Sequence, residues 1–541
     1  MQRTWRIMCG AAAACLLAAM ALGPAAHAAT KVWSGNGNWG DAYWSPSAPV
    51  DGDDAVISSG AVTVNVNTAY LSSFTNNATV VFNGWSTILY ATNDTVNGTV
   101  THLAQSATTT NGSGAWVPDN RVYIACSNLT VAAGGKIDVS SCGYAGTNAA
   151  TGRGPGGGTG GSAANYWGGG GSYGGIGCAG GQGGGSIPSP SPYGAVSAPE
   201  DPGSAGGGSG YTGLGAGGAG GGAAKIVASG SVTVNGTIAA NGQSKAGNTA
   251  YGAGSGGAVL IACSTLTGTG TISVAGGAGG SYSGAGAGGR IAITVSAAAQ
   301  DALPRQVRTV TAAGGAPGTG PGGMGTLYVS RGSVLLDPNS YLTVTNNTFD
   351  LRFPATFYCD GTILVTNGGI VTVTAAPTNG ATAYGSLMTC AQDLIVATNS
   401  ALILASDPTN GGSVQISVRD FVVAGGGLVS ASSNGFGSGY GAGRGYPGNA
   451  GDGPSGGSYG GLGGQGSAGH YGFGTYGSSN APIDPGSPGG LWVPTSGPGG
   501  PGGGLIWVQA SRTIRVDGRM TTDGAVSPGS VQGAGAGGGI Y

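Results

Sequence analysis

Few side chains in this sequence could carry out acid–base or metal chemistry, and those few are scattered. Glycosidases need two carboxylates at a set separation, but Glu200 is the single glutamate of the chain. Beyond the first 28 residues the histidines are His102 and His470, which lie far apart and have no cysteine or acid at the spacing of a metal site. A Ser-His-Asp triad is equally unsupported, and each of the two histidines is expected to be a solvated loop residue. We therefore expect no catalytic residue, no metal ligand and no bound cofactor.

The aspartates that cluster or recur are typical of turns. Asp51, Asp53 and Asp54 could bind Ca²⁺, but the further acids and the terminal glutamate of an EF-hand are missing. Asp201 and Asp484 stand in two matching Asp-Pro-Gly-Ser segments, and Asp-Pro-Gly is ordinary turn chemistry. The sequence favours turns at all five positions. One basic residue, at 290, follows a glycine-rich run, which favours the end of a loop.

Six cysteines follow residue 28, and an even number in an exported chain permits disulfides. Cys126 aligns with Val418 in the repeat described below, which favours an apolar core position for Cys126. Cys142 and Cys178 bracket the first glycine-rich stretch. We take these two as the candidate disulfide.

Aromatic residues recur within the glycine-rich stretches. Tyr166, Trp167, Tyr173 and Tyr459 are the candidates for exposed contacts with a sugar or a partner surface. The alternative is that these rings pack the glycine-rich segments together. The sequence leaves both explanations open.

The first residues have the pattern of an export signal. Two arginines precede an apolar run at 7–22, and an Ala-His-Ala pattern follows at 26–28. This order is typical of a secretory signal peptide, and the apolar run is shorter than the ~20 residues of a membrane-spanning helix. We predict that residues 1–28 are removed on export and that no transmembrane segment remains. The expected location is extracellular or at the cell surface.

Glycine supplies 120 of the 541 residues and proline 26, while charged residues make up only 7% and the net charge is −2. Each glycine costs about 1 kcal/mol in a helix, so a helical protein is excluded. The lack of a basic stripe excludes a nucleic-acid partner. Glycine does not occur at every third position, which excludes collagen.

The residues between the glycine-rich stretches are typical of strands. Valine, isoleucine, leucine and threonine alternate with period two, as in 371–373 and 414–418. A longer repeat is superimposed: 122–144 aligns without a gap with 414–436, and later segments continue the match up to Tyr541. The second copy stops inside a strand that the first copy continues, so we expect the sequence to be part of a longer protein.

Duplicated strand–turn–strand units with inserted loops are the signature of a solenoid. We predict an all-β fold, a parallel β-helix (β-solenoid) with long glycine-rich insertions; the alternative is a row of tandem β-sandwiches. The insertions are either flexible coil or packed extended strands of polyglycine. The predicted divisions are a signal peptide, N-terminal coils, a first glycine-rich block, intervening coils and a second glycine-rich block, at 1–28, 29–120, 121–295, 296–413 and 414–541.

Two parts of the chain resemble known families. Residues 33–44, WSGNGNWGDAYW, resemble the opening motif of secreted bacterial β-helical proteins of the autotransporter-passenger type, although Tyr43 stands where an asparagine is common. The runs GSYGG at 171–175 and 457–461 and GAGGRIAI at 286–293 resemble large glycine-rich secreted proteins. These resemblances imply an extracellular β-helix with a role in adhesion or envelope structure.

These observations lead to one main functional expectation and two alternatives. The main one is a non-enzymatic extracellular structural or adhesin-like module, with a polysaccharide or a cell-surface component as its partner. The first alternative is a polysaccharide-active lyase or hydrolase on the same fold, which requires acids that converge on one face. The second is a protein that binds ice or another regular surface through ladders of threonine.

Overall fold

The structure, a computed structural model, describes residues 29–541 except 149, 162–166, 181–189, 211–214, 246–249, 305, 307, 317–319, 338, 340, 346–347, 353–355, 378–382, 450–451, 468, 493–497 and 527–531. The predicted signal peptide lies outside the described residues.

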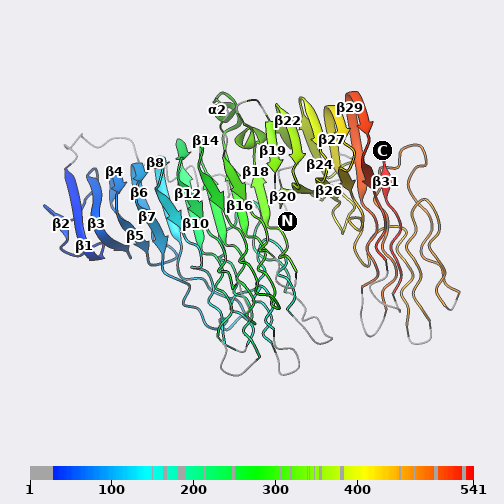
Figure 1. The fold of residues 1–541 in the computed structure, drawn as a ribbon, viewed down its shortest axis with the longest axis horizontal. Helices are drawn as coiled ribbons and strands as arrows, with labels where there is room; N and C mark the ends of the chain where they lie inside the picture. Colours follow the sequence, from blue (N-terminus) through cyan, green and yellow to red (C-terminus); the bar gives the residue numbers. More distant parts are fainter. Residues whose placement is uncertain are drawn as a thin grey trace, which may run out of the picture.

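The chain winds into a long β-solenoid, whose coils follow one another from the N-terminal to the C-terminal end (Figure 1). The strands form one sheet of 23 and one of 8 strands. Neighbouring coils pair in parallel, and the pair β1–β2 is antiparallel. The predicted parallel β-helix is confirmed, and the alternative of antiparallel β-sandwiches is wrong.

Among its described residues, the N-terminal part of the solenoid contains sixteen strands. They are β1 (Thr30–Asn38), β2 (Trp44–Ser45), β3 (Asp54–Val64), β4 (Tyr70–Asn76), β5 (Thr79–Phe82), β6 (Leu89–Val96), β7 (Thr99–His102), β8 (Val122–Val131), β9 (Lys136–Asp138), β10 (Ala223–Ala228), β11 (Ser231–Val234), β12 (Thr237–Ala239), β13 (Ala258–Ala262), β14 (Thr265–Thr267), β15 (Thr271–Ser273) and β16 (Arg290–Thr294).

The C-terminal part begins with a short helix. Its elements are α2 (Ala297–Asp301), β17 (Thr309–Thr311), β18 (Thr326–Val329), η1 (Gly332–Leu335), β19 (Tyr341–Thr345), β20 (Thr348–Arg352), β21 (Thr356–Cys359), β22 (Thr362–Thr366), β23 (Ile370–Thr374), β24 (Ser386–Cys390), β25 (Asp393–Val396), β26 (Ala401–Ala405), β27 (Val414–Val423), β28 (Leu428–Ser430), β29 (Leu505–Val516), β30 (Arg519–Thr521) and β31 (Gly539–Ile540). Within the described part of the chain, no helix is long and apolar enough to cross a membrane.

The core is built from rows of inward side chains that repeat at the same register in successive coils. One row runs through six coils without interruption and consists of Val62, Val80, Val100, Ile137, Ile238 and Ile272. All six side chains are buried. Full burial of a Val or Ile side chain contributes about 1.5–3 kcal/mol, so each coil is stabilised mainly by the coils on either side of it.

The tryptophan motif closes the N-terminal end of this core. The Trp44 ring lies edge-on to Trp33 and Trp39, with centroids 5.4 Å and 4.8 Å away. The Trp44 indole N–H donates to the Trp39 carbonyl at 2.8 Å. Tyr43, the departure from the common motif, packs its ring 5.2 Å from Trp33.

The two duplicated units occupy different columns of the solenoid. In the first unit β9 pairs with β7 and β12. Its counterpart β28 instead pairs with β26 and β30, in a column that runs back through β23, β20 and β18 to β16 and β13. Up to β18 this column contains strands such as β13 and β16, and from β20 onwards it leads to β28. Because β28 is the counterpart of β9, the second unit is rotated about the solenoid axis relative to the first.

The glycine-rich stretches form two bundles of extended chain that hang from one side of the solenoid (Figure 1). Hydrogen bonds join their backbones laterally: the Gly207 N–H donates to Gly169 O, Gly252 N–H to Gly207 O, and Gly218 N–H to Gly252 O, at 2.8–2.9 Å. Of the two possibilities that the sequence left open, the described segments are the packed one. The first bundle also includes residues beyond 295, the predicted end of the first glycine-rich block, because Gly323 N–H donates to Ile176 O at 2.7 Å.

Close packing, rather than unusual backbone angles, accounts for most glycines in the bundles. A Cβ on Gly252 would overlap the carbonyl oxygen of Gly169, and a Cβ on Gly170 would overlap that of Ala285. Within 152–222 the described glycines with positive φ are Gly154 and Gly194. Most of the others are glycine because a side chain would separate the neighbouring chains.

Candidate functional site

The aromatic residues predicted to make external contacts are mostly buried. Tyr173 is 0% and Tyr459 8% exposed, so the prediction of exposed contacts is wrong for both. Trp167 is half-buried and stacks on Tyr282 with ring centroids 5.1 Å apart. Tyr166 lies outside the described residues. The rings pack the bundles instead of facing a ligand.

The same tyrosine pair fastens each bundle near the solenoid. In the first bundle Tyr173 and Tyr193 have ring centroids 4.7 Å apart, and the Tyr193 hydroxyl donates to Pro202 O at 2.6 Å and lies 2.8 Å from the Ser204 hydroxyl. In the second bundle Tyr459 pairs with Tyr476 at 4.9 Å, with the matching bonds to the residues at 485 and 487. Both copies of the repeat therefore contain the same tyrosine pair with matching hydrogen bonds, called the anchor below.

Asp201 and Asp484 lie beside these anchors. A Cβ on Gly194, which has a φ of 75°, would meet a carboxylate oxygen of Asp201, and Gly477 stands in the same relation to Asp484. Burial raises the pKa of both carboxyls. The two environments match, but no turn is assigned at 201–204 or at 484–487, so the predicted turns are not observed.

A cluster of charged and aromatic side chains occurs where the first bundle meets the solenoid. Glu200 accepts from Arg121 at 2.5 Å and from Lys225 at 2.7 Å. The Arg121 guanidinium lies 4.5 Å from the Trp85 ring centroid and 4.9 Å from that of Tyr123. Burial acts to raise the pKa of Glu200, but the bonds from Lys225 and Arg121 outweigh it and hold this pKa below its usual value.

Sequence reasoning missed this cluster because its members come from distant parts of the chain. The one available signal was that Glu200 is the single glutamate. In the second copy the residues that align with Arg121, Lys225 and Glu200 are Ser413, Trp507 and Ile483. The charged cluster is therefore particular to the first bundle.

Arg290 begins β16 directly after a glycine-rich return, as the sequence predicts for a loop end. Its guanidinium is buried, donates to Tyr193 O at 2.8 Å and to the Thr326 hydroxyl at 3.1 Å, and lies 5.4 Å from the Tyr173 ring. Arg290 thus ties the first anchor to two strands of the solenoid. Its contacts are those of a structural residue.

Two carboxylates meet on the outer face of the C-terminal coils. Asp393 and Asp420 are in register on β25 and β27. Arg419 holds Asp393 with two bonds of 3.0 Å and 2.9 Å, and Arg512 donates to Asp420 at 2.9 Å through Nε. The Arg512 bond is the main cause that keeps the pKa of Asp420 below its usual range. Each acid is engaged by an arginine.

The two histidines have different surroundings, and Asp53 accepts hydrogen bonds from the backbone. His102 is buried and accepts from Ala223 N–H at 3.1 Å, so its prediction as a solvated loop residue is wrong. His470 is half-exposed and stacks on Tyr446. Asp53 accepts from Val50 N–H at 3.0 Å, which confirms the predicted turn. Over the described residues, no three His, Cys, Asp or Glu side chains are grouped as a metal site would require.

The structure does not bring Cys142 and Cys178 together, so the candidate disulfide between them is wrong. The Cys142 sulfur lies 3.9 Å from the Thr101 hydroxyl, whereas that of Cys178 donates to Ala179 O at 3.4 Å. The two residues belong to different layers, the solenoid and the bundle.

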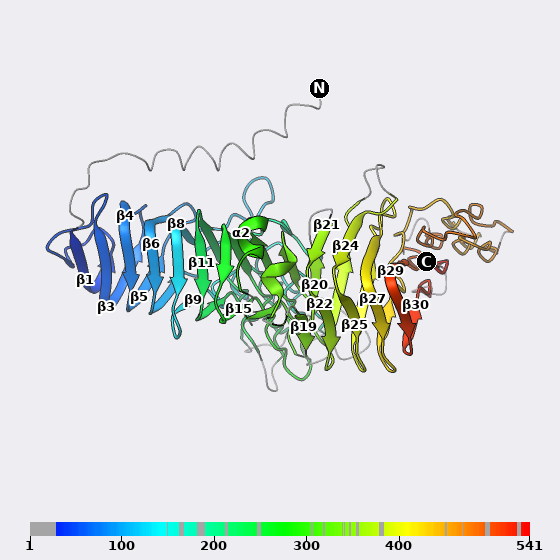
Figure 2. The same cartoon turned by 90° about the horizontal axis from the view of Figure 1, so that it is seen from above.

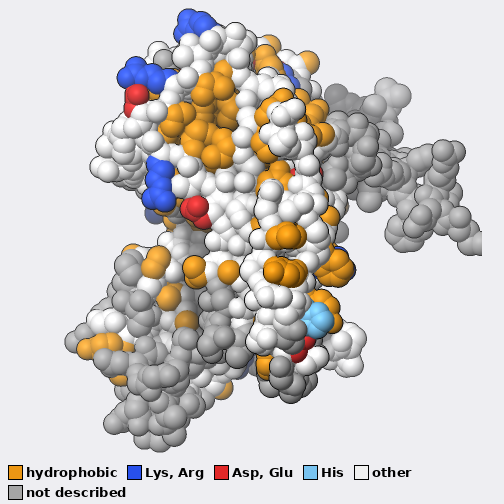
Figure 3. Space-filling view, turned by 90° about the vertical axis from the view of Figure 1, so that its right-hand side faces the viewer, with side chains coloured by type: hydrophobic (Ala, Val, Ile, Leu, Met, Phe, Trp, Pro, Cys, Tyr) orange, Lys and Arg blue, Asp and Glu red, His pale blue; other side chains and the backbone are white. Residues whose placement is uncertain are grey.

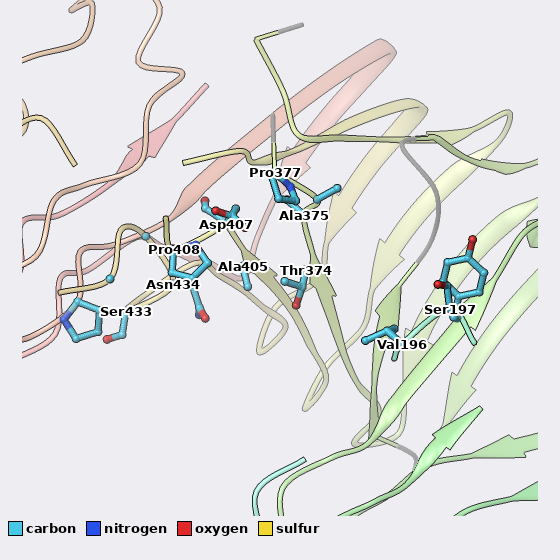
Figure 4. A pocket seen from close by; sticks show the side chains of 16 residues that line it. Val196, Ser197, Thr374, Ala375, Pro377, Ala405, Asp407, Pro408, Ser433 and Asn434 are labelled. Atoms are coloured by element: carbon cyan, nitrogen blue, oxygen red, sulfur yellow. The ribbon is translucent and has the colours of Figure 1, made fainter. Parts of the chain in front are cut away.

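A cavity of about 650 Å³ lies between the two bundles (Figure 4). Val196 comes from the first bundle, Ser433 and Asn434 come from the second copy, and Thr374 and Asp407 come from the coils between them. The Asp407 carboxylate accepts from two backbone N–H groups of its own turn, at 2.9 Å each. The remaining lining is uncharged and combines alanine and proline side chains with hydroxyl groups and one amide.

The outer face of β4, β6, β8, β11 and β14 carries two uncharged rows of hydroxyl and amide side chains. The threonine hydroxyls at 233 and 267 lie 2.8 Å apart, and the Asn128 amide donates to Asn93 at 3.0 Å. Figure 2 shows β4, β6, β8 and β11 side by side on the side away from the first bundle. The rows are Ser73, Asn93, Asn128, Ser231, Thr265 and Thr75, Thr95, Thr130, Thr233, Thr267.

Comparisons with known proteins found no matching family model, no similar curated protein and no similar solved structure. The functional argument therefore rests on the geometry of this chain.

Proposed function

We propose that the protein is a non-enzymatic extracellular module, a rigid spacer of structural or adhesin-like type. The observation that carries this proposal is the construction of the two bundles. They are long enough to form binding loops, yet their described segments are joined largely by backbone–backbone hydrogen bonds, with the anchor rings of Tyr173 and Tyr459 buried.

The proposed rigidity rests on how the bundles offset the conformational entropy that glycine loses on ordering. Ordering glycine costs more conformational entropy than ordering any other residue. The bundles offset that cost with lateral hydrogen bonds and with the tyrosine anchors. Loops that needed only to bind or to move would not require such close packing, whereas a spacer that must keep its shape outside the cell would.

Hydrogen exchange of the exported chain tests the spacer proposal. We expect the amides of 203–208 and 252–257 to be protected as strongly as those of β10 and β13, because both sets are hydrogen-bonded between neighbouring chain segments. Exchange of the glycine segments at the rate of free peptide, with the coils still protected, would show that the bundles are flexible and would overturn the proposal.

A second candidate function is adhesion to a regular surface, and the two polar rows favour it. Side chains in these rows repeat at the coil spacing of about 4.8 Å, and the rows lie two residues apart, about 6.6 Å. Uncharged hydroxyl groups at fixed spacing complement a surface that repeats hydroxyl groups, such as an insoluble polysaccharide. Ice would be the other regular surface.

Co-sedimentation with cellulose, chitin and ice separates these partners. The substitutions Thr130→Lys and Thr233→Lys place charge in the centre of the row and should abolish binding. Thr108→Lys, at an exposed loop position, is the matched control. Binding that survives both row substitutions would exclude this face.

The polysaccharide-active enzyme remains the alternative to a non-enzymatic role. It would use Asp393 and Asp420, the acids that meet on one face. The arginines that engage both acids favour an ion-pair role. Release of new reducing ends or unsaturated sugars from polysaccharides, lost in Asp393→Asn, would support the enzyme and contradict the spacer.

A further inference from the structure

Cys359 and Cys390 stand at the ends of β21 and β24, in register on adjacent coils. Adjacent parallel strands lie about 4.7–4.9 Å apart, within the Cα separation of about 4.4–6.8 Å that a disulfide spans. Both side chains point into the core, with 0% and 2% exposure. Because residues in register project in the same direction, their sulfur atoms face the same space.

The two sulfur atoms share one neighbour. Gly361 O accepts from the Cys390 thiol at 2.7 Å and lies 3.7 Å from the Cys359 sulfur. The thiols are also hydrogen-bonding neighbours of each other, and this contact lowers the pKa of Cys390 and raises that of Cys359. The two thiols are therefore close enough to interact directly in the folded chain.

The other cysteine in a comparable core position lacks such a partner in register. Cys126 is in register with Ala91 on one side and with Ala228 on the other. The repeat places Val418 at the position of Cys126, so a thiol is not required there. The pairing geometry is therefore a property of positions 359 and 390.

We propose that Cys359 and Cys390 form a disulfide that staples two successive coils. The inference rests on the proposed export, because a lasting disulfide requires an oxidising compartment. A disulfide oxidant, RSSR, supplies the oxidation: the thiolate of one cysteine attacks one of its sulfurs and expels RS⁻. The thiolate of the other cysteine then attacks the cysteine sulfur of the mixed disulfide and expels the second RS⁻. The two cysteines are oxidised, and RSSR is reduced to two thiols.

The position of the proposed disulfide indicates which part of the fold it stabilises. β21 has four residues and, among the described strands, pairs with β24 alone, so it is the edge strand of its sheet. It lies just after the column change at β18 and β20. A covalent bond at this point fixes the first strand of a new column to the coil that follows it. Because both thiols are buried in the folded protein, the bond forms during folding.

The test is refolding of the full chain in a buffer of reduced and oxidised glutathione, followed by mapping of unreduced peptides. We expect one peptide pair that joins Cys359 to Cys390, lighter by two hydrogen atoms than the free thiols and separated by dithiothreitol. Maleimide labelling of both thiols when the refolded chain is unfolded in urea without a reductant, or a different pairing, would overturn the proposal. Because glutathione supplies the oxidant, this result does not depend on whether the chain is exported.

A second measurement uses variants. Dithiothreitol should lower the midpoint of thermal unfolding of the oxidised wild-type chain, and this shift should vanish in a chain carrying Cys359→Ala and Cys390→Ala. Cys126→Val, which introduces the residue that the other copy of the repeat carries, should keep the shift. If dithiothreitol lowered the unfolding midpoint of the double variant by the same amount, the effect would not come from a disulfide between Cys359 and Cys390. Chain recovered from the culture medium with both thiols reduced would also contradict the staple, whereas failure of export alone would overturn only the proposed location.

Discussion

At the scale of the residue, Asp94 is the most unexpected feature of the core. It stands in an inner row between Phe74 and Leu129, is 2% exposed, and neither carboxyl oxygen has a hydrogen-bond partner among the described residues. Burial raises the pKa of Asp94 to about 8. The group is therefore neutral at pH 7, where an aspartate is normally charged.

The substitution Asp94→Asn should remove a pH dependence of stability. The pKa is higher in the folded than in the unfolded chain, so stability is greatest below about pH 4 and falls until about pH 8. The loss is about 1.4 kcal/mol per pH unit, or roughly 4 kcal/mol between pH 4 and pH 7. Urea unfolding at several pH values measures it. The exposed Asp517→Asn is the control, and an unchanged slope in Asp94→Asn would contradict the assignment.

The ionisation of His102 should change stability with pH in the opposite direction to that of Asp94. Burial lowers the pKa of His102 to about 4, so its contribution to stability is complete above about pH 6.5 and is lost as the pH falls towards 4. Protonation would occupy Nε2, which accepts from Ala223 N–H. In an Asp94→Asn background, His102→Gln should flatten the remaining slope between pH 6.5 and pH 4 in urea titrations. His470→Gln should leave that slope unchanged.

At the scale of the element, the sequence predicted the strands and missed their partners. Alternating residues such as Val371 and Val373 predict a strand because the inner side of each coil is apolar throughout. Asp94 breaks that alternation, and no local pattern predicts its burial. The Glu200 cluster and the change of column also escape prediction, because both depend on which distant segments become neighbours.

The bundles predict a sharp difference between two glycine-to-alanine substitutions. A Cβ at Gly252 would overlap the Gly169 carbonyl, whereas a Cβ at Gly460 meets nothing within 4 Å. We expect Gly252→Ala to destabilise the protein by about 1–3 kcal/mol, as overpacking does. Gly460→Ala should change stability by less than about 0.5 kcal/mol. Thermal unfolding followed by circular dichroism compares them, and equal effects would contradict close packing.

At the scale of the whole molecule, the solenoid ends in an exposed core. Inner-row residues Ile514 and Val516 are 55% and 42% exposed on β29, the strand that follows β27 in the column. Figure 3, which faces this end, shows hydrophobic side chains gathered over the last coil. A strand edge beside uncovered apolar side chains favours contact with another chain.

We therefore expect a polypeptide that consists of residues 29–541 alone to associate as its concentration rises. Ile514→Lys should shift sedimentation velocity profiles towards the monomer, because it places a charge among the uncovered inner-row side chains. Ile176→Lys, at an exposed apolar position in the first bundle, is the control. Equal association of both variants would locate the contact elsewhere.

The close packing of the bundles also has a genetic consequence. Every glycine codon begins with two guanines, so almost any change in either of those bases adds a side chain. Where a Cβ would overlap a carbonyl oxygen, as at Gly170 and Gly252, the position tolerates only third-base changes. The bundles should therefore diverge among natural variants by gain or loss of whole extended segments, while the outer faces of the coils diverge by ordinary substitution.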